Sequence, residues 1–130
     1  MTSDDCPCGL GLPYDDCCGR LHRGEPAPTA EALMRSRYSA FVHGDIDYLT
    51  RTWHPSTRPQ PLTLDPALRW TGLHVIAATR GGLLDDDGEV EFVARWEDAD
   101  GRRGRNHERS TFVRERGRWV YVDALPDGRH

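Results

Sequence analysis

The sequence contains no lysine, since all 17 of its basic side chains are arginine. This absence excludes Schiff-base and amine-nucleophile chemistry and leaves every basic contact to a guanidinium. Long hydrophobic runs are missing too. The apolar stretch Val75–Ala78 is far shorter than the ~20 residues of a membrane-spanning helix. The first residues also lack the basic start and apolar run of a secretory signal. We therefore expect a cytoplasmic protein with no membrane segment.

The length and charge of the chain exclude further classes. Its 130 residues make one domain, or a domain with a small appendage, and are too few for a barrel enzyme of about 250 residues. The net charge of −4 argues against a general nucleic-acid-binding protein. The chain also lacks a nucleophile-elbow, P-loop or dinucleotide-binding motif.

Cysteine is absent after residue 18, and all four cysteines stand close together: Cys6, Cys8, Cys17 and Cys18. Disulfides between such near neighbours would be strained and would not persist in the cytoplasm. Free thiols and a redox pair are the alternatives to a metal site. Four thiolates in a Gly- and Pro-rich loop suit a tetrahedral zinc ion. We expect one structural zinc, because four protein ligands leave no open position for a catalytic water.

Helical signals follow the cysteine segment. The stretch 25–28 predicts a short, stiff linker, after which Thr29 can cap a helix over 30–43 that ends at Gly44. Asp45 can cap a second helix that continues to Trp53. The pair Asp65-Pro66 favours a third, short helix toward Trp70.

The pattern then changes to short β-like runs separated by Asp- and Gly-rich turns. These turns are hairpin signals. Helices followed by an antiparallel meander make an α+β arrangement, with the helices packed on one face of a curved sheet. The expected strands are 73–80, 89–97, 106–115 and 118–123.

A first resemblance lies in the cysteine segment. The run CPCGLGLPYDDCCG (residues 6–19) resembles the SEC-C zinc motif, which also occurs at the C-terminus of the SecA translocation ATPase. The resemblance implies that all four cysteines are zinc ligands. Where the motif usually carries Lys or Arg between its ligand pairs, this chain has Leu12, Pro13, Asp15 and Asp16. We therefore expect weak or no binding to an acidic partner of the SecB kind.

A second resemblance covers nearly the whole chain. The stretches that carry it are LMRSRYSAFV (33–42), YL (48–49), TWHP (52–55), FVAR (92–95), ERS (108–110) and WVYVD (119–123). Together they resemble the YchJ family of bacterial proteins. The resemblance implies a SEC-C motif joined to a nuclear transport factor 2-like domain, a cone-shaped, cystatin-like roll. The domain limits expected from it are 1–24 for the zinc motif, 25–29 for the linker, 30–125 for the roll and 126–130 for a tail.

A candidate cavity follows from helical and strand periodicity. At about 100° per residue, Arg37 lies at the centre of the apolar stripe of the 30–43 helix, and Arg35 lies on the opposite side. We expect Arg35 to be an unpartnered surface residue. A buried charge needs a partner. Alternation along the last strands predicts Glu108 or Asp123 as that partner. The candidate ligand-binding residues are Arg37, Tyr38, Glu108, Ser110, Tyr121 and Asp123.

Two interpretations of this cavity stay open, a structural ion pair and an anion-binding site. The corresponding functional hypothesis is an adaptor module that binds a protein partner or a small ligand, with nucleic acid not expected. The alternative is an isomerase-, dehydratase- or hydrolase-like enzyme that uses the cavity. A filled cavity with exposed apolar side chains near the cysteines would favour the adaptor. A hydrated, polar-lined cavity with a carboxylate of strongly shifted pKa would favour the enzyme.

Overall fold

Helices precede strands in the computed structural model, which describes residues 5–59 and 62–124. The cysteine segment forms a 3-10 helix and a short α-helix, two further helices follow, and four strands complete the described chain. The elements are η1 (Tyr14–Asp16), α1 (Cys18–His22), α2 (Ala30–His43), α3 (Ile46–Arg51), β1 (Arg69–Arg80), β2 (Asp87–Glu97), β3 (Arg103–Glu115) and β4 (Arg118–Ala124).

Local capping sets the limits of α2 and the start of α3. The Thr29 hydroxyl accepts a hydrogen bond from the Ala32 amide at 3.0 Å, and Gly44 ends α2 with a φ of 70°. The Asp45 carboxylate accepts from the Tyr48 amide at 3.1 Å and so caps α3. The prediction for α2 is confirmed. Helix α3 is shorter than expected, because Trp53 instead forms a bridge with Tyr121 of β4.

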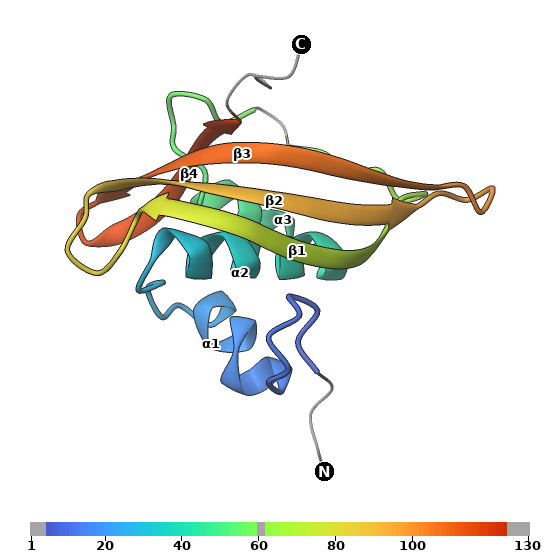
Figure 1. Ribbon diagram of the computed structural model, residues 1–130, viewed down its shortest axis with the longest axis horizontal. Coiled ribbons are helices and arrows are strands. Elements are labelled where there is room, and N and C mark those ends of the chain that lie inside the picture. Colours follow the sequence, from blue (N-terminus) through green and yellow to red (C-terminus); the bar gives the residue numbers. More distant parts are fainter. Residues whose placement is uncertain (1–4, 60–61, 125–130) are drawn as a thin grey trace.

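The four strands form one antiparallel meander in the order β1-β2-β3-β4. Helices α2 and α3 cover one face of this sheet, and the cysteine segment lies on the far side of α2 from the sheet (Figure 1). The core between helices and sheet includes fully buried Leu33, Leu49, Val90 and Phe112. The predicted α+β class is thus confirmed.

The helix predicted from Asp65 toward Trp70 is wrong. The Asp65 carboxylate accepts from the Ala67 amide at 2.9 Å, but this makes only a turn. Trp70 belongs to β1 and lies opposite Trp96 of β2, because sheet pairing outweighs a local capping signal. The strands extend beyond their predicted limits for the same reason.

A β-bulge separates the two halves of β4. Thr111 pairs with Asp123, whereas Phe112 pairs with Tyr121, so Val122 is the extra residue. A bulge changes the alternation of side chains along a strand. The predicted common face of Tyr121 and Asp123 depends on unbroken alternation, which this strand does not have.

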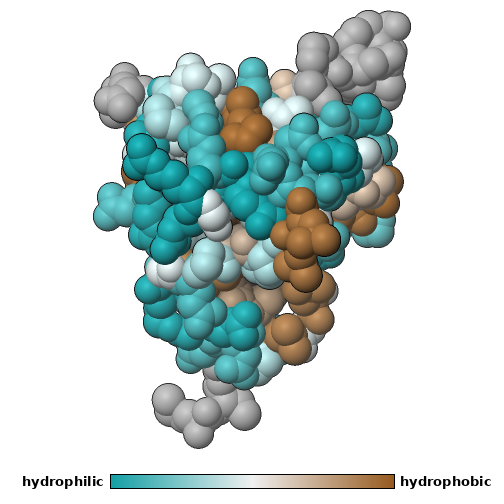
Figure 2. Space-filling view, turned by 90° about the vertical axis from the view of Figure 1, so that its left-hand side faces the viewer, coloured by the Kyte–Doolittle hydropathy of each residue, from teal (hydrophilic) through white to brown (hydrophobic). Residues whose placement is uncertain are grey.

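The outer surface is mainly hydrophilic on the end of the molecule seen in Figure 2, with apolar groups gathered toward one side. Leu83 and Leu84, in the loop between β1 and β2, are 66% and 98% exposed. Among residues 5–59 and 62–124, no helix combines the length and apolar character that crossing a membrane requires. The predicted tail, 126–130, lies outside the described residues.

Candidate metal centre and ligand cavity

The four cysteines converge on one point. Their sulfur atoms all lie within 4.8 Å of one another, and Cys6, Cys8 and Cys18 are buried. The Cys8 and Cys17 sulfurs are 3.5 Å apart, too far for a disulfide bond of about 2.05 Å. A tetrahedral ion with Zn–S bonds of about 2.3 Å would place sulfurs ~3.8 Å apart. The donor set and its spacing therefore fit a metal ion held by four thiolates.

The electrostatics of the cluster call for a cation. Hydrogen bonding between Cys6 and Cys18 lowers the pKa of the Cys6 thiol and raises that of Cys18. Burial raises the pKa of the Cys17 thiol to about 12. Four sulfurs this close cannot all ionise unless a positive charge offsets their repulsion, and a bound metal ion supplies that charge.

Glycine shapes the backbone around the cluster. Gly9 and Gly11 have φ angles of 89° and 81°, which L side chains rarely adopt. Gly19 is required for a different reason, because a Cβ there would lie 2.7 Å from the Tyr14 carbonyl oxygen. The turn that brings Cys17 and Cys18 back to the first pair thus depends on a residue without a side chain.

The cysteine segment is docked on the outer side of α2. Arg35 donates to the Cys8 carbonyl at 2.8 Å and pairs with Glu31 at 3.0 Å. The His22 ring nitrogen Nε2 donates to the Ser36 carbonyl at 2.9 Å. Arg35 was expected to be an unpartnered surface residue, and this prediction is wrong. The side of α2 away from the sheet is covered by the cysteine segment, which leaves the Arg35 side chain only 15% exposed.

A cavity of about 270 Å³ lies on the other side of α2, between the helices and the concave face of the sheet. Five of the six predicted ligand-binding residues line it, and most of its other walls are apolar or aromatic. The lining residues are Met34, Arg37, Tyr38, Phe41, Trp53, Trp70, Phe92, Ala94, Asn106, Glu108, Ser110, Phe112 and Tyr121.

Arg37 is buried as predicted, with 6% of its surface exposed, but it forms no ion pair with a described carboxylate. Its Nη1 donates to the Leu49 carbonyl at 2.9 Å and to the Thr52 hydroxyl at 2.7 Å, and so caps the C-terminus of α3. The guanidinium also lies 4.7 Å from the Tyr121 ring centre and 5.1 Å from that of Trp53. Burial lowers the pKa of Arg37 to about 10, which leaves it charged at neutral pH.

The predicted pairing of Arg37 with Asp123 or Glu108 is therefore wrong. Asp123 is exposed and does not line the cavity, because the bulge at Val122 breaks the alternation of β4. Its carboxylate instead accepts from the Ala124 amide at 2.9 Å. Glu108 does line the cavity. Arg37, however, donates its hydrogen bonds to acceptors at the end of α3 and not to the predicted carboxylate.

The remaining predicted residues lie where alternation placed them. Ser110 is buried on the cavity side of β3, and Glu108 lies two residues away, open to solvent on one side. Burial against its apolar neighbours raises the pKa of Glu108 above its usual range. Burial also raises the pKa of both Tyr38 and Tyr121 to about 12, so both phenols are neutral.

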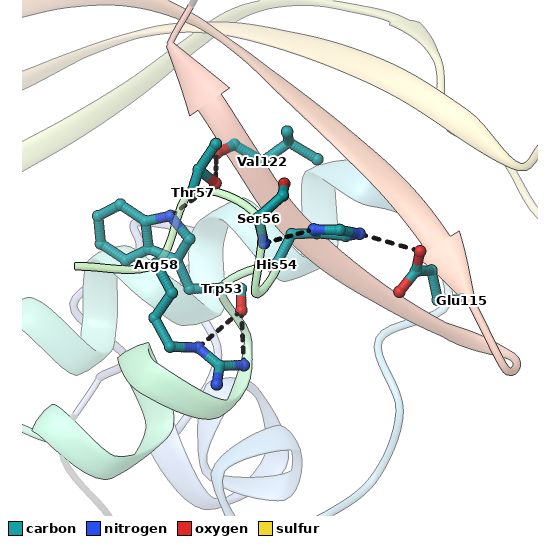
Figure 3. Close-up of polar contacts among 7 residues, drawn as sticks. All are labelled: Trp53, His54, Ser56, Thr57, Arg58, Glu115 and Val122. Atoms are coloured by element: carbon teal, nitrogen blue, oxygen red, sulfur yellow. Dashed lines mark hydrogen bonds and ion pairs between the residues drawn. The ribbon is translucent and has the colours of Figure 1, made fainter. Parts of the chain in front are cut away.

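The loop after α3 holds Trp53 against the cavity. The Trp53 indole donates to the Thr57 hydroxyl at 3.1 Å, and Thr57 in turn donates to the carbonyl of Val122 at the bulge (Figure 3). Arg58 donates twice to the Trp53 carbonyl. His54 pairs with Glu115 at 3.0 Å. The bulge and this loop therefore stabilise each other and fix one wall of the cavity.

Sequence reasoning missed several cavity residues, among them Phe41, Trp53, Trp70 and Asn106. Asn106 could have been found, since it stands two residues before Glu108 on the same strand face. Trp70 could not, because the pair Asp65-Pro66 predicts a helix over its segment. Trp53 reaches the cavity only through the tertiary bridge to β4.

Comparison with known proteins matches both parts of the chain. Residues 3–20 match the SEC-C motif, and residues 29–124 match the middle, nuclear transport factor 2-like domain of YchJ. The molecule is thus a two-part protein of the SEC-C and nuclear transport factor 2-like class. The chain belongs to the YchJ family, whose curated members carry the name UPF0225 protein.

Relatives and solved structures agree with this assignment. The UPF0225 protein of Streptomyces coelicolor is 53% identical over 95% of this chain and 96% of its own length. That of Cupriavidus pinatubonensis is 54% identical over 94% and 88%. The solution structure of a SEC-C motif containing protein from Rhodopseudomonas palustris is similar, with a TM-score of 0.81 and 37% identity. The match covers 94% of this chain and 98% of that one.

Proposed function

We propose that this chain is a small-ligand-binding protein whose cavity takes a molecule with an anionic group. One observation carries the proposal. The buried guanidinium of Arg37 lines an open cavity of about 270 Å³ and has no carboxylate partner among the described residues. Burying a cation is costly unless it is offset, and an anionic ligand supplies the charge that the protein does not.

The geometry of Arg37 leaves room for such a group. Of its hydrogen-bonding nitrogens, only Nη1 has an acceptor among the described residues. Guanidinium groups bind carboxylates through two adjacent N–H groups. The contacts with Trp53 and Tyr121 hold the planar group in place, so little entropy is lost when it binds a ligand.

The cysteine cluster serves as a structural metal site in this proposal. A tetrahedral set of four thiolates is typical of structural zinc, and a site closed by four protein ligands has no position left for a substrate. Its role is to fold residues 5–24 and hold them against α2. Loading of one zinc per chain, measured by metal analysis of protein purified without chelator, tests this part.

The ligand proposal is tested by native mass spectrometry of protein purified gently from cells, followed by NMR titration with 4-methylbenzoate. We expect a small-molecule adduct with an anionic group on the wild type that is absent from Arg37→Met. We also expect 4-methylbenzoate to shift the resonances of cavity residues such as Ser110 and Phe92. Arg109→Met, which changes an exposed arginine of β3 outside the cavity, is the matched control. Equal behaviour of the two variants would contradict the proposal.

A further inference from the structure

Two opposite charges line one cavity without meeting. Arg37 and Glu108 both border it, yet no ion pair joins them. Tyr121 also lines the cavity. Burial is the main cause of its raised pKa, while the charge of Glu108 raises that pKa further and the charge of Arg37 lowers it. Opposite charges at the walls of a partly apolar cavity attract each other strongly. Because they do not pair with each other, both charges are available to a bound ligand.

Glu108 is exceptional among the glutamates of the sheet. Each of the other described strand glutamates lies within ion-pair distance of an arginine or a histidine: Glu89 with Arg109, Glu91 with His107, Glu97 with Arg69 and Arg103, and Glu115 with His54. Glu108 has no such partner among the described residues. Among the residues that the structure describes, Glu108 is also the one strand glutamate that lines the cavity, and Arg37 is the one cation that does so.

The wall near Glu108 combines polar and apolar surface. Asn106, Glu108 and Ser110 line the cavity along β3, while the paired residues of β2 include Phe92 opposite Glu108 and Ala94 opposite Asn106. A ligand lying along this wall would meet polar groups on β3 and apolar surface beside them on β2. The cavity volume of about 270 Å³ limits the ligand to a small molecule.

We propose that the ligand bridges the two charges: a small, largely apolar molecule with a carboxylate that binds Arg37 and an ammonium group that binds Glu108. This inference rests on the proposed function and specifies its ligand class. A simple carboxylic acid would leave Glu108 without a partner, and a simple amine would leave Arg37 without one. A molecule that carries both groups satisfies both walls at once.

The experiment compares three probes of nearly equal size by NMR titration of the full zinc-loaded chain. They are 4-(aminomethyl)benzoate, which carries both groups, 4-methylbenzoate, which carries only the carboxylate, and 4-methylbenzylamine, which carries only the ammonium. We expect the first to bind about tenfold more tightly than either of the others. Glu108→Gln should remove its advantage over 4-methylbenzoate, and Arg37→Met should remove its advantage over 4-methylbenzylamine.

The control is Glu91→Gln, because Glu91 pairs with His107 outside the cavity, and it should leave all three affinities unchanged. If Glu108→Gln fails to fold, Glu108→Asp keeps the charge on a shorter side chain and should weaken only the probes that carry an ammonium. Equal binding of 4-(aminomethyl)benzoate and 4-methylbenzoate to the wild type would overturn the bridging inference and leave the anion site standing. Binding of no probe below about 10 mM would overturn both proposals.

Discussion

Replacing Arg35 by alanine tests how tightly the metal centre is joined to the domain. Arg35 belongs to α2, yet its guanidinium donates to the carbonyl of Cys8 at 2.8 Å. Cys8 is fully buried, so water cannot readily replace the arginine as a donor. Arg35→Ala should therefore weaken metal binding by the cysteines, although Arg35 lies 27 residues from Cys8 in the sequence.

The size of the effect follows from the contacts. A hydrogen bond to a charged group contributes about 1.5–3 kcal/mol, and a buried carbonyl left without a donor costs about 1–3 kcal/mol. These figures describe one interaction and are not added. The ion pair with Glu31 contributes little, because the Glu31 side chain is 39% exposed. We expect a loss of about 2 kcal/mol, which corresponds to about a 30-fold lower zinc affinity.

The assay is competition for zinc against a chromophoric chelator at fixed pH. Glu31→Gln removes the ion pair and keeps the bond to Cys8, so its effect should stay within about 0.5 kcal/mol. Arg109→Ala removes an exposed arginine of β3 and should leave zinc affinity unchanged. If Arg35→Ala matched either control, the cysteine segment would not depend on α2, and the docking described above would have no energetic weight.

Three further predictions concern the cavity and the cysteine loop. Arg37→Met should lower the free energy of unfolding by about 2 kcal/mol in chemical denaturation, because it removes a charged hydrogen-bond donor without leaving a described carboxylate unpaired. A loss above about 4 kcal/mol would reveal an ion pair that the described residues do not form. Burial raises the pKa of Glu108, so the folded protein holds the proton of this carboxyl more tightly than the unfolded chain does. The free energy of unfolding should therefore fall as the pH rises above 4.5, the ordinary pKa of a glutamate. Denaturation between pH 4 and about 7 should show this slope reduced in Glu108→Gln, and an unchanged slope would argue against burial of that carboxylate. Gly19→Ala should reduce zinc retention during dialysis against a chelator, because its Cβ would lie 2.7 Å from the Tyr14 carbonyl, and full retention would contradict this packing.

Part of the fold could be predicted because its signals are local. Thr29, Gly44 and Asp45 act within a few residues of themselves, and the structure confirms each as a helix terminus. The same kind of signal failed at Asp65, where a turn forms and the chain then joins the sheet. Pairing with β2 is a long-range interaction that no local pattern reports.

Most of the candidate residues do line the cavity, but the contacts predicted for them are wrong. Helical periodicity correctly placed Arg37 on the buried side of α2, since a period of 3.6 residues holds wherever a helix forms. Its partners were wrong, because the acceptors come from the C-terminus of α3, whose position depends on packing. The bulge at Val122 turned Asp123 away, and such an insertion leaves no clear mark in the sequence.

By itself, the sequence determined the four-cysteine cluster, the α+β class and the burial of Arg37, because each depends on spacing or periodicity along a short stretch of chain. Only the tertiary structure decided that Arg35 reaches Cys8 and that Arg37 caps α3 while Glu108 keeps no partner. These outcomes depend on which segments cover the two sides of α2 and on the position of the bulge in β4. Packing between segments far apart in the chain decides both. That packing also determines which acceptors lie within hydrogen-bonding distance of each charged side chain.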